Sequence, residues 1–142
     1  MANVIPYAFR GQLFSGTHNF ASGGNQFKLA LYTSNPYNTS STVYVTTNEV
    51  SSSGGTNYTT TGNTLSGNAV VATTAVASCD FADTSWTSAT ITAAFGTIYN
   101  DDQSDKLCVV LDFDGSKSCT NGTFTISFPS PSTAADAIIS MA

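Results

Sequence analysis

The fold is decided by residues 86–128, which read WTSATITAAFGTIYNDDQSDKLCVVLDFDGSKSCTNGTFTISF. Apolar and polar residues alternate along three parts of this stretch, and a period of two is typical of β-strands with one buried face. We therefore predict strands at 89–99, 107–113 and 123–128. The acidic residues at 100–106 and the Asn121-Gly122 pair predict turns before the second and third of these strands.

The same patterns outside this stretch predict a mainly β domain with one helix. A short helix is expected at 4–15, where Pro6 lies in the first turn and the spacing of Tyr7, Arg10, Leu13 and Phe14 is helical. Further strands are expected at 26–33 and 43–46, and residues 68–72 and 76–81 are expected as two short strands or one broken strand. Together these elements predict a single-domain antiparallel β-sandwich over residues 1–142, of seven or eight strands. Periodicity does not show whether the strands are connected as in a jelly roll or as in an immunoglobulin-like fold.

One strand breaks its own alternation. In the predicted strand 89–99, Ile91, Ala93 and Phe95 share a face, but Ile98 falls on the other. Either Gly96 marks a β-bulge, or both faces of this strand are covered. Coverage of both faces would indicate a central strand or a strand at a subunit contact.

Charge and composition narrow the classes of partner. Four Lys and Arg residues oppose nine Asp and Glu, a net charge of −5, which argues against nucleic acid and anionic membranes. Only 9% of residues are charged, against about a quarter in an average soluble domain. No apolar run approaches the roughly 20 residues that cross a bilayer, and the N-terminus does not read as a signal peptide. Such a weakly charged, polar surface suits packing against other proteins, on a particle or outside a cell.

The three cysteines, Cys79, Cys108 and Cys119, have spacings that form no disulfide framework. We expect reduced thiols in a protein made in the cytoplasm. A bridge between Cys108 and Cys119 remains an alternative if their strands are neighbours.

Candidate chemical groups are few, and we predict a non-enzymatic protein without catalytic, cofactor or metal-binding residues. The single histidine, His18, lies in a loop rich in Gly, Ser and Asn and is expected at the surface. The sequence lacks a G-x-S-x-G nucleophile elbow and zinc-like Cys/His spacing. Carboxylates occur at Asp101, Asp102, Asp105, Asp112 and Asp114. They are expected as solvated turn residues, with a Ca²⁺ site or a glycosidase pair as alternatives.

Two segments lack a clear pattern and are candidates for contact with partners. Residues 47–67 form a long polar stretch, predicted as an arm that orders against a neighbouring subunit, an exposed binding loop or an unstructured loop. Residues 129–142 form a C-terminal tail that ends either as a short edge strand or as a docking segment. With the N-terminal segment, these are the predicted contact elements.

Scattered runs across the whole chain resemble small structural proteins of tailed bacteriophages, particularly head decoration (cement) proteins. These runs are M-A-N-x-x-P-Y-x-F at 1–9, F-K-L-A-L-Y-T-S at 27–34, S-W-T-S-A-T-I-T-A at 85–93, I-Y-N-D at 98–101 and D-F-D-G with N-G-T-F-T-I-S-F within 112–128. The resemblance implies a virion protein that is made in the host cytoplasm and seated on the capsid surface. It also implies a partner, the major capsid protein, and self-association, often as a homotrimer.

Two other functions compete with this expectation. A phage tail or fibre module would bind a host receptor or glycan, using Trp86, Tyr37 and Tyr58 as stacking groups. For Trp86, capping of the core is the main expectation. An enzyme, most plausibly a glycan hydrolase, would use a pair of the carboxylates named above.

Overall fold

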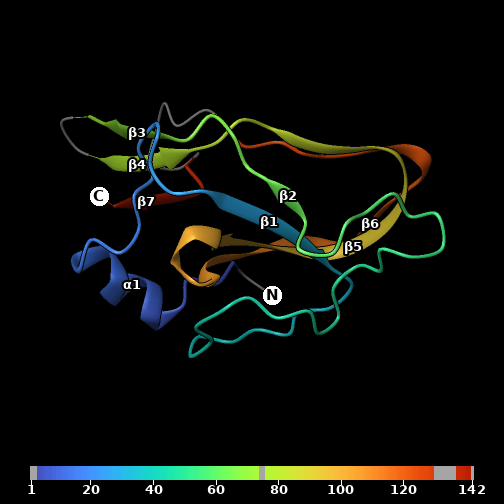
Figure 1. Cartoon of the computed structure of the whole chain (residues 1–142), viewed down its shortest axis with the longest axis horizontal. Coiled ribbons are helices and arrows are strands. Elements are labelled where there is room, and N and C mark those ends of the chain that lie inside the picture. Colours follow the sequence, from blue (N-terminus) through green and yellow to red (C-terminus); the bar gives the residue numbers. More distant parts are fainter. Residues whose placement is uncertain (1–2, 74–75, 130–136, 142) are drawn as a thin grey trace.

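The computed structural model describes residues 3–73, 76–129 and 137–141, which form two antiparallel β-sheets and a short N-terminal helix (Figure 1). In chain order the elements are α1 (Tyr7–Phe14), β1 (Phe27–Tyr32), β2 (Asn63–Thr64), β3 (Ala69–Ala72), β4 (Ala77–Asp80), β5 (Thr84–Asn100), a 3-10 turn (Asp101–Gln103), β6 (Lys106–Ile126) and β7 (Ile139–Met141). One sheet has the order β2-β1-β5-β6 and the other the order β3-β4-β7. The mainly β sandwich with a short helix is the fold class that the sequence predicts.

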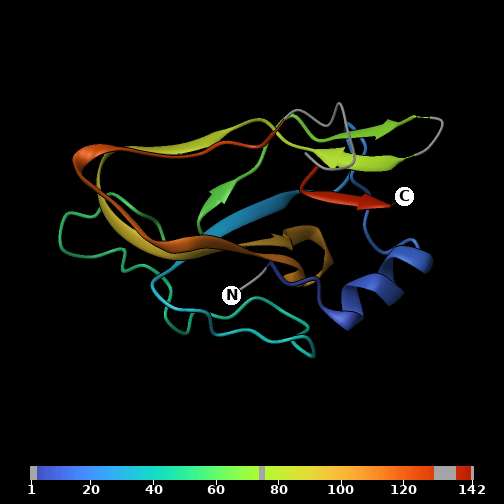
Figure 2. The ribbon, with the colours of Figure 1, turned by 180° about the vertical axis from the view of Figure 1, so that it is seen from behind.

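The two longest strands, β5 and β6, pair with each other and run along the long axis of the molecule (Figure 2). The sequence predicts two strands, at 107–113 and 123–128, where the structure has the single strand β6. That prediction was wrong because β5 also begins earlier than expected, at Thr84, and offers a partner over the whole distance.

Two β-bulges in β6 lie where the sequence predicts a break between the strands 107–113 and 123–128. Residues 113–116 lie opposite Ala94 alone, and residues 120–121 lie opposite Thr90. Positive φ angles occur here at Asp114, Gly115 and Asn121. Asp-Gly and Asn-Gly pairs supply the positive φ that a bulge needs as well as the positive φ of a hairpin turn, so the sequence signal does not separate the two.

The broken alternation in β5 results from a shift in register and from cover on both faces. The register against β6 shifts between Ala93 and Phe95, beside the larger bulge, rather than at Gly96. Ala93 and Ile98 therefore both face the core between the sheets, while Phe95 packs against a second apolar cluster. Since β5 lies between β1 and β6, it is a central strand, one of the two alternatives that the sequence left open.

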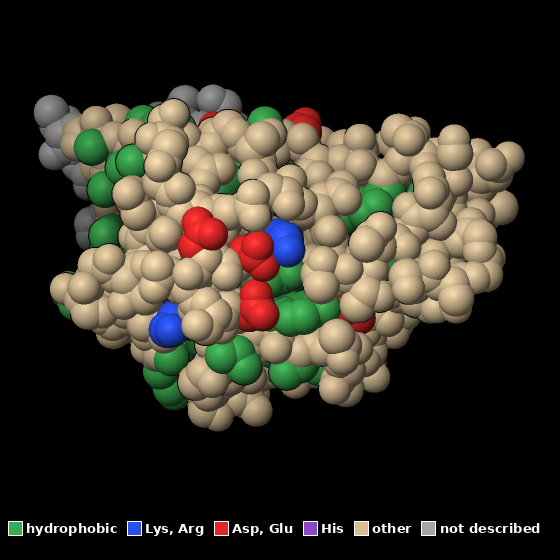
Figure 3. Space-filling view, viewed as in Figure 1, with side chains coloured by type: hydrophobic (Ala, Val, Ile, Leu, Met, Phe, Trp, Pro, Cys, Tyr) green, Lys and Arg blue, Asp and Glu red, His purple; other side chains and the backbone are tan. Residues whose placement is uncertain are grey.

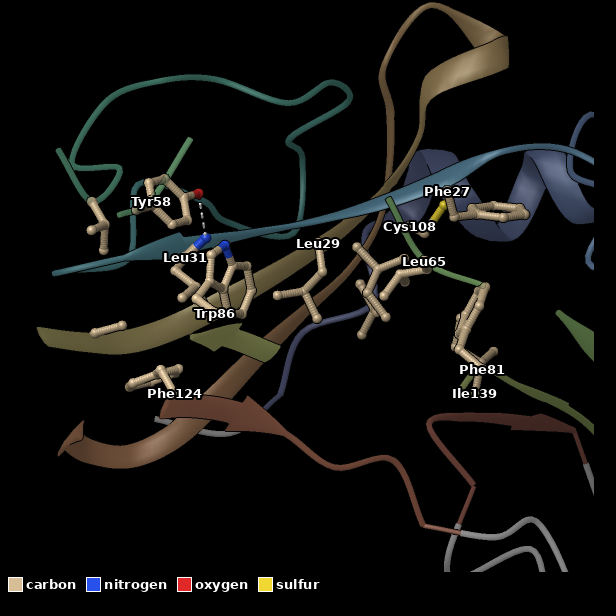
Figure 4. Close-up of a cluster of buried hydrophobic side chains, with 14 of the residues drawn as sticks. Phe27, Leu29, Leu31, Tyr58, Leu65, Phe81, Trp86, Cys108, Phe124 and Ile139 are labelled. Atoms are coloured by element: carbon tan, nitrogen blue, oxygen red, sulfur yellow. Dashed lines mark hydrogen bonds between the residues drawn. The ribbon is translucent and has the colours of Figure 1, made fainter. Parts of the chain in front are cut away.

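The main core fills the space between the two sheets. Phe27, Leu29 and Leu31 of β1 are fully buried, and Figure 4 shows them among side chains from both sheets and from the loops. Phe20 stacks on Phe27 with ring centroids 4.4 Å apart. Each buried side chain of this size contributes about 1.5–3 kcal/mol relative to an exposed one, so the alternation that predicts the sheet also supplies its main stabilisation.

The second face of the four-stranded sheet is covered by the loop that follows β1. Tyr32 and Tyr99 are buried there, although simple alternation leaves one face of each strand open to water. Tyr44 from the loop stacks on Tyr99 with centroids 4.5 Å apart, and Tyr32 Oη lies 2.7 Å from Tyr37 Oη. The strand predicted at 43–46 is replaced by a single bridge between Val43 and Lys106, because the loop packs through these side chains rather than through a ladder.

The polar segment 47–67 folds onto its own sheet. Val50 donates a backbone hydrogen bond to Leu31 O over 2.9 Å, and Leu31 N donates to Tyr58 Oη over 3.0 Å. The segment is thus ordered against β1 of the same chain, and the alternative of an unstructured loop was wrong. Residues 51–55 are its longest exposed run.

The N-terminal helix is short and places one fully buried aromatic side chain in the core. Pro6 is the N-cap residue, so the missing N–H costs nothing there. Phe9 is the buried residue of α1 and packs against His18 and Phe20, with centroids 5.0 Å and 6.1 Å away. No helix in the described ranges is long and apolar enough to cross a membrane.

The C-terminal tail predicted at 129–142 falls mostly outside the described residues. Its described end forms β7, which pairs with β4 as the last strand of the smaller sheet. The edge-strand alternative is therefore the one found for residues 139–141.

Candidate functional site

The acidic loop after β5 is held against the start of β1. Asp101 forms an ion pair with Lys28 over 3.0 Å, and Asp102 Oδ2 accepts a hydrogen bond from Gln26 N over 2.7 Å. Partial burial, followed by the charge of Asp101, raises the pKa of Asp105. These contacts give the loop a structural role, which is to fix the β5–β6 connection.

The second carboxylate pair, Asp112 and Asp114, lies at the larger bulge of β6. Asp112 Oδ1 accepts a hydrogen bond from Asp114 N over 2.9 Å, an Asx-type contact that stabilises a local turn. Lys117 Nζ donates to Asp114 O over 3.3 Å. Within the described residues, no three His, Cys, Asp or Glu side chains are arranged to hold a metal ion.

His18 is buried, with 8% of its surface exposed, so its predicted place at the surface was wrong. Its Nε2 lies 2.8 Å from Gln12 Oε1, and its Nδ1 lies 2.9 Å from Asn100 Nδ2. Asn100 Nδ2 also donates to Asn25 Oδ1 over 3.1 Å, so Nδ1 of His18 accepts and Nε2 carries the hydrogen. A loop rich in Gly, Ser and Asn normally indicates exposure, and nothing near His18 in the sequence reveals a partner 82 residues away.

Cys108 and His18 are neighbours with the residue types of a catalytic nucleophile and its base, but their surroundings do not activate the thiol. The Cys108 Sγ lies 3.9 Å from His18 Nδ1. Burial raises the pKa of the Cys108 thiol well above its ordinary value, and burial followed by the charge of Lys106 lowers the pKa of His18 to about 4. A reactive cysteine needs a lowered thiol pKa and access to substrate. This neutral, buried pair is therefore part of the core.

The cysteines are all free thiols, so the alternative bridge between Cys108 and Cys119 is not formed. Cys79 and Cys108 are buried, and Cys119 is half-buried in β6. Reduced thiols are what the spacing of the cysteines predicts.

The aromatic groups considered for sugar stacking are also core residues. Tyr37, Tyr58 and Trp86 are all buried. Trp86 packs between Tyr58 and Phe124, with ring centroids 5.8 Å and 6.3 Å away. Their burial leaves none of these rings a face on which a sugar could stack.

The clearest candidate for a functional site is an apolar groove between α1 and β7. The groove has a volume of about 390 Å³. Its apolar walls come from Ile5, Phe9, Leu13, Phe14, Ile139 and Met141. Helix α1 and strand β7 are the two ends of the described chain, so the fold brings distant segments together here.

The rim of this groove carries large apolar side chains that face water. Phe14 is 92% exposed and Met141 59%, and Tyr7, which contacts Arg10 beside the groove, is 60% exposed. Figure 3 shows hydrophobic side chains gathered around a basic one over the α1 end of the molecule, while acidic side chains lie over the neighbouring 3-10 turn. Contiguous apolar surface of this kind in a soluble protein marks sites of interaction.

Arg10 contributes the positive charge of the groove. Its guanidinium lies 5.0 Å from the centre of the Tyr7 ring, and its Nη2 donates a long hydrogen bond of 3.4 Å to Ile5 O. Across the described ranges the one ion pair is that of Lys28 with Asp101, so Arg10 pairs with no carboxylate there. A cation in an apolar groove favours an occupant that brings an anion.

A smaller pocket of about 230 Å³ continues from the groove past β7 toward the buried His18. Leu13, Ile139 and Met141 line both spaces. Val70, which is 56% exposed, lies on the far side of this pocket. The apolar surface around β7 is therefore continuous from α1 to β3.

Two of the three predicted contact elements meet at this groove. The N-terminal segment and the end of the C-terminal tail form its walls, while residues 47–67 line neither the groove nor the smaller pocket. The carboxylates singled out in the sequence lie elsewhere. Sequence reasoning missed the groove because Phe14 and Met141 have ordinary core chemistry, and only their exposure marks the site.

Comparison of the chain with protein-family models, with curated protein sequences and with solved structures finds no match.

Proposed function

We propose that this chain is a non-enzymatic virion structural protein that decorates a phage capsid and stabilises it by bridging neighbouring capsomers. The observation that carries this proposal is the exposed apolar groove between α1 and β7, which suits contact with another protein. The resemblance to decoration proteins supports it further, since the resembling runs overlap α1, β1, β5 and β6, the helix and the main sheet.

The proposal implies two kinds of contact. Each copy would bind the major capsid protein, and copies would associate with one another as a homotrimer, at the capsid surface, after synthesis in the host cytoplasm. An interface of the order of 1,000 Å² per copy is modest, but several such contacts in one oligomer add by avidity. A small apolar groove is sufficient in such an arrangement, because no single copy has to bind tightly.

The alternative is a tail or fibre module that binds a host receptor or glycan. Its expected stacking groups, Tyr37, Tyr58 and Trp86, are buried. No observation in the described part of the chain favours it over decoration, so it stays the second proposal.

Copy number per purified virus particle tests the proposal. Quantitative mass spectrometry should find hundreds of copies that scale with the capsid lattice. A copy number of a few, or at most some dozens, would indicate a tail protein and make receptor binding the leading proposal. Absence from particles would overturn both proposals.

A further inference from the structure

We infer that the groove between α1 and β7 binds a polypeptide segment that presents an apolar side chain next to an aspartate or glutamate, whose carboxylate pairs with Arg10. This inference rests on the proposed function, in which the segment belongs to the capsid protein under the decoration protein. It names the chemistry of the partner and the residues that recognise it.

Phe14 and Met141 are the exposed large apolar side chains of the groove. A helix of eight residues that is attached through Phe9 gains little by placing a phenylalanine almost fully in water. Burial of Phe14 and Met141 against a partner would remove this apolar area from water, which favours binding. Aromatic residues and arginine are also the residue types that most often dominate binding energy at interfaces.

Arg10 is the charged residue of the groove. Arg10 contacts the ring of Tyr7 and donates one long hydrogen bond to Ile5 O. Its guanidinium can therefore donate two hydrogen bonds to a carboxylate without breaking an ion pair of the described residues. The carboxylate would be partly desolvated between apolar walls, where a charged hydrogen bond is stronger than in water. A groove that is apolar except for one charge also fixes the orientation of its occupant.

A second copy of this chain is a poorer occupant. A two-fold contact through α1 would place two Arg10 guanidinium groups close together, which is repulsive. Charge complementarity thus favours a different chain with a local acidic residue.

The test uses virus particles that lack this protein and the purified protein added back to them. Phe14→Ser and Arg10→Glu remove the two recognition elements. Val43→Ser is the matched control for the first, since Val43 is also an exposed apolar residue but lies outside the groove. Lys117→Glu is the matched control for the charge reversal, since Lys117 lies on β6 away from α1. The oligomeric state and the unfolding midpoint of every variant are measured alongside binding.

Both groove variants should bind particles at least about tenfold more weakly than wild type, a change of about 1.4 kcal/mol. Arg10→Lys should keep part of the affinity, and the two controls should bind as wild type does. Binding of wild type should weaken as ionic strength rises, and Arg10→Gln should show less of this dependence.

Three results would overturn the inference in ways that can be told apart. If the groove variants fold and bind like wild type, the groove is not the binding site, while the decoration proposal stands. Variants that dissociate the oligomer instead would make a second copy the occupant. Wild-type protein that does not bind the particles would remove the proposed function and this inference together.

Discussion

Asn100 donates a hydrogen bond from its side-chain amide to Nδ1 of His18 over 2.9 Å, and so joins the last residue of β5 to the loop after α1. On the other side of the ring, Nε2–H of His18 donates to Gln12 Oε1 in the helix over 2.8 Å. A single neutral imidazole therefore connects α1, its following loop and the central strand. The position of α1, and with it one wall of the groove, depends on this ring staying neutral.

The first prediction is that the protein loses stability between pH 6.5 and pH 4. Burial holds the pKa of His18 at about 4 in the folded state, against 6.5 ordinarily. The unfolded chain therefore binds the proton first, and the stability that is complete above pH 6.5 is lost as pH falls toward 4. At about 1.4 kcal/mol per pKa unit, the loss is at most about 3.5 kcal/mol. Urea unfolding at a series of pH values measures it.

His18→Gln is the control for this pH dependence. The variant removes the titrating group, so its free energy of unfolding should change less than that of wild type from pH 6.5 down to pH 5, where carboxylates are still mostly ionised. Equal slopes for the two proteins would show that His18 is not the cause.

The second prediction is that Glu49→Gln destabilises the protein by about 1–3 kcal/mol. Glu49 Oε1 accepts hydrogen bonds from Tyr58 Oη over 2.7 Å and from Thr61 N over 2.8 Å, and Oε2 accepts one from Tyr44 Oη. An amide group in this place offers one acceptor oxygen instead of two, so at least one of these donors loses its partner. Chemical denaturation of wild type and variant gives the difference.

A double-mutant cycle with Tyr58→Phe checks the mechanism of the Glu49 effect. Once Tyr58→Phe has removed the phenol that needs an acceptor, Glu49→Gln should cost less than it does in the wild-type protein. Additive effects of the two substitutions would contradict a direct hydrogen bond between these side chains.

The third prediction concerns Gly62, which has φ +75° and lies against β1. A Cβ at this position would overlap the carbonyl oxygen of Leu29, so Gly62→Ala forces the backbone of a central segment apart. Gly54, with φ +76°, has open space around it, and Gly54→Ala should cost only the roughly 1–2 kcal/mol of the left-handed conformation. Gly62→Ala should cost at least about 2 kcal/mol more. Thermal unfolding of the two variants compares them, and equal midpoints would contradict the close approach.

The fourth prediction is that one thiol reacts much faster than the other two in the folded protein. Cys119 is partly exposed, whereas Cys108 is fully buried and burial raises the pKa of Cys79 to about 12. Labelling with a thiol reagent near neutral pH should show a fast phase that disappears in Cys119→Ser. The buried thiols should react only as the structure opens locally. A fast reaction at Cys108 would show that the His18 site is accessible.

Local pattern was sufficient for much of the fold. The alternation in β1, the short strands β3 and β4 and the proline at the start of α1 are properties of neighbouring residues, and sequence shows them directly. Interpretation failed where one sequence signal serves two structures. Asp114-Gly115 and Asn121-Gly122 supply positive φ equally to a turn and to a bulge, and the long partner strand decided between them.

The sequence by itself determined a mainly β chain with an N-terminal helix, reduced cysteines and a weakly charged surface, because periodicity and composition are local quantities. Only the tertiary structure decided that His18 is buried, that Tyr37, Tyr58 and Trp86 are core residues, and that Phe14 and Met141 meet in one groove. Burial and proximity depend on contacts between residues far apart in the chain. The sequence does not distinguish a buried phenylalanine such as Phe9 from an exposed one such as Phe14, and only the packing around them does.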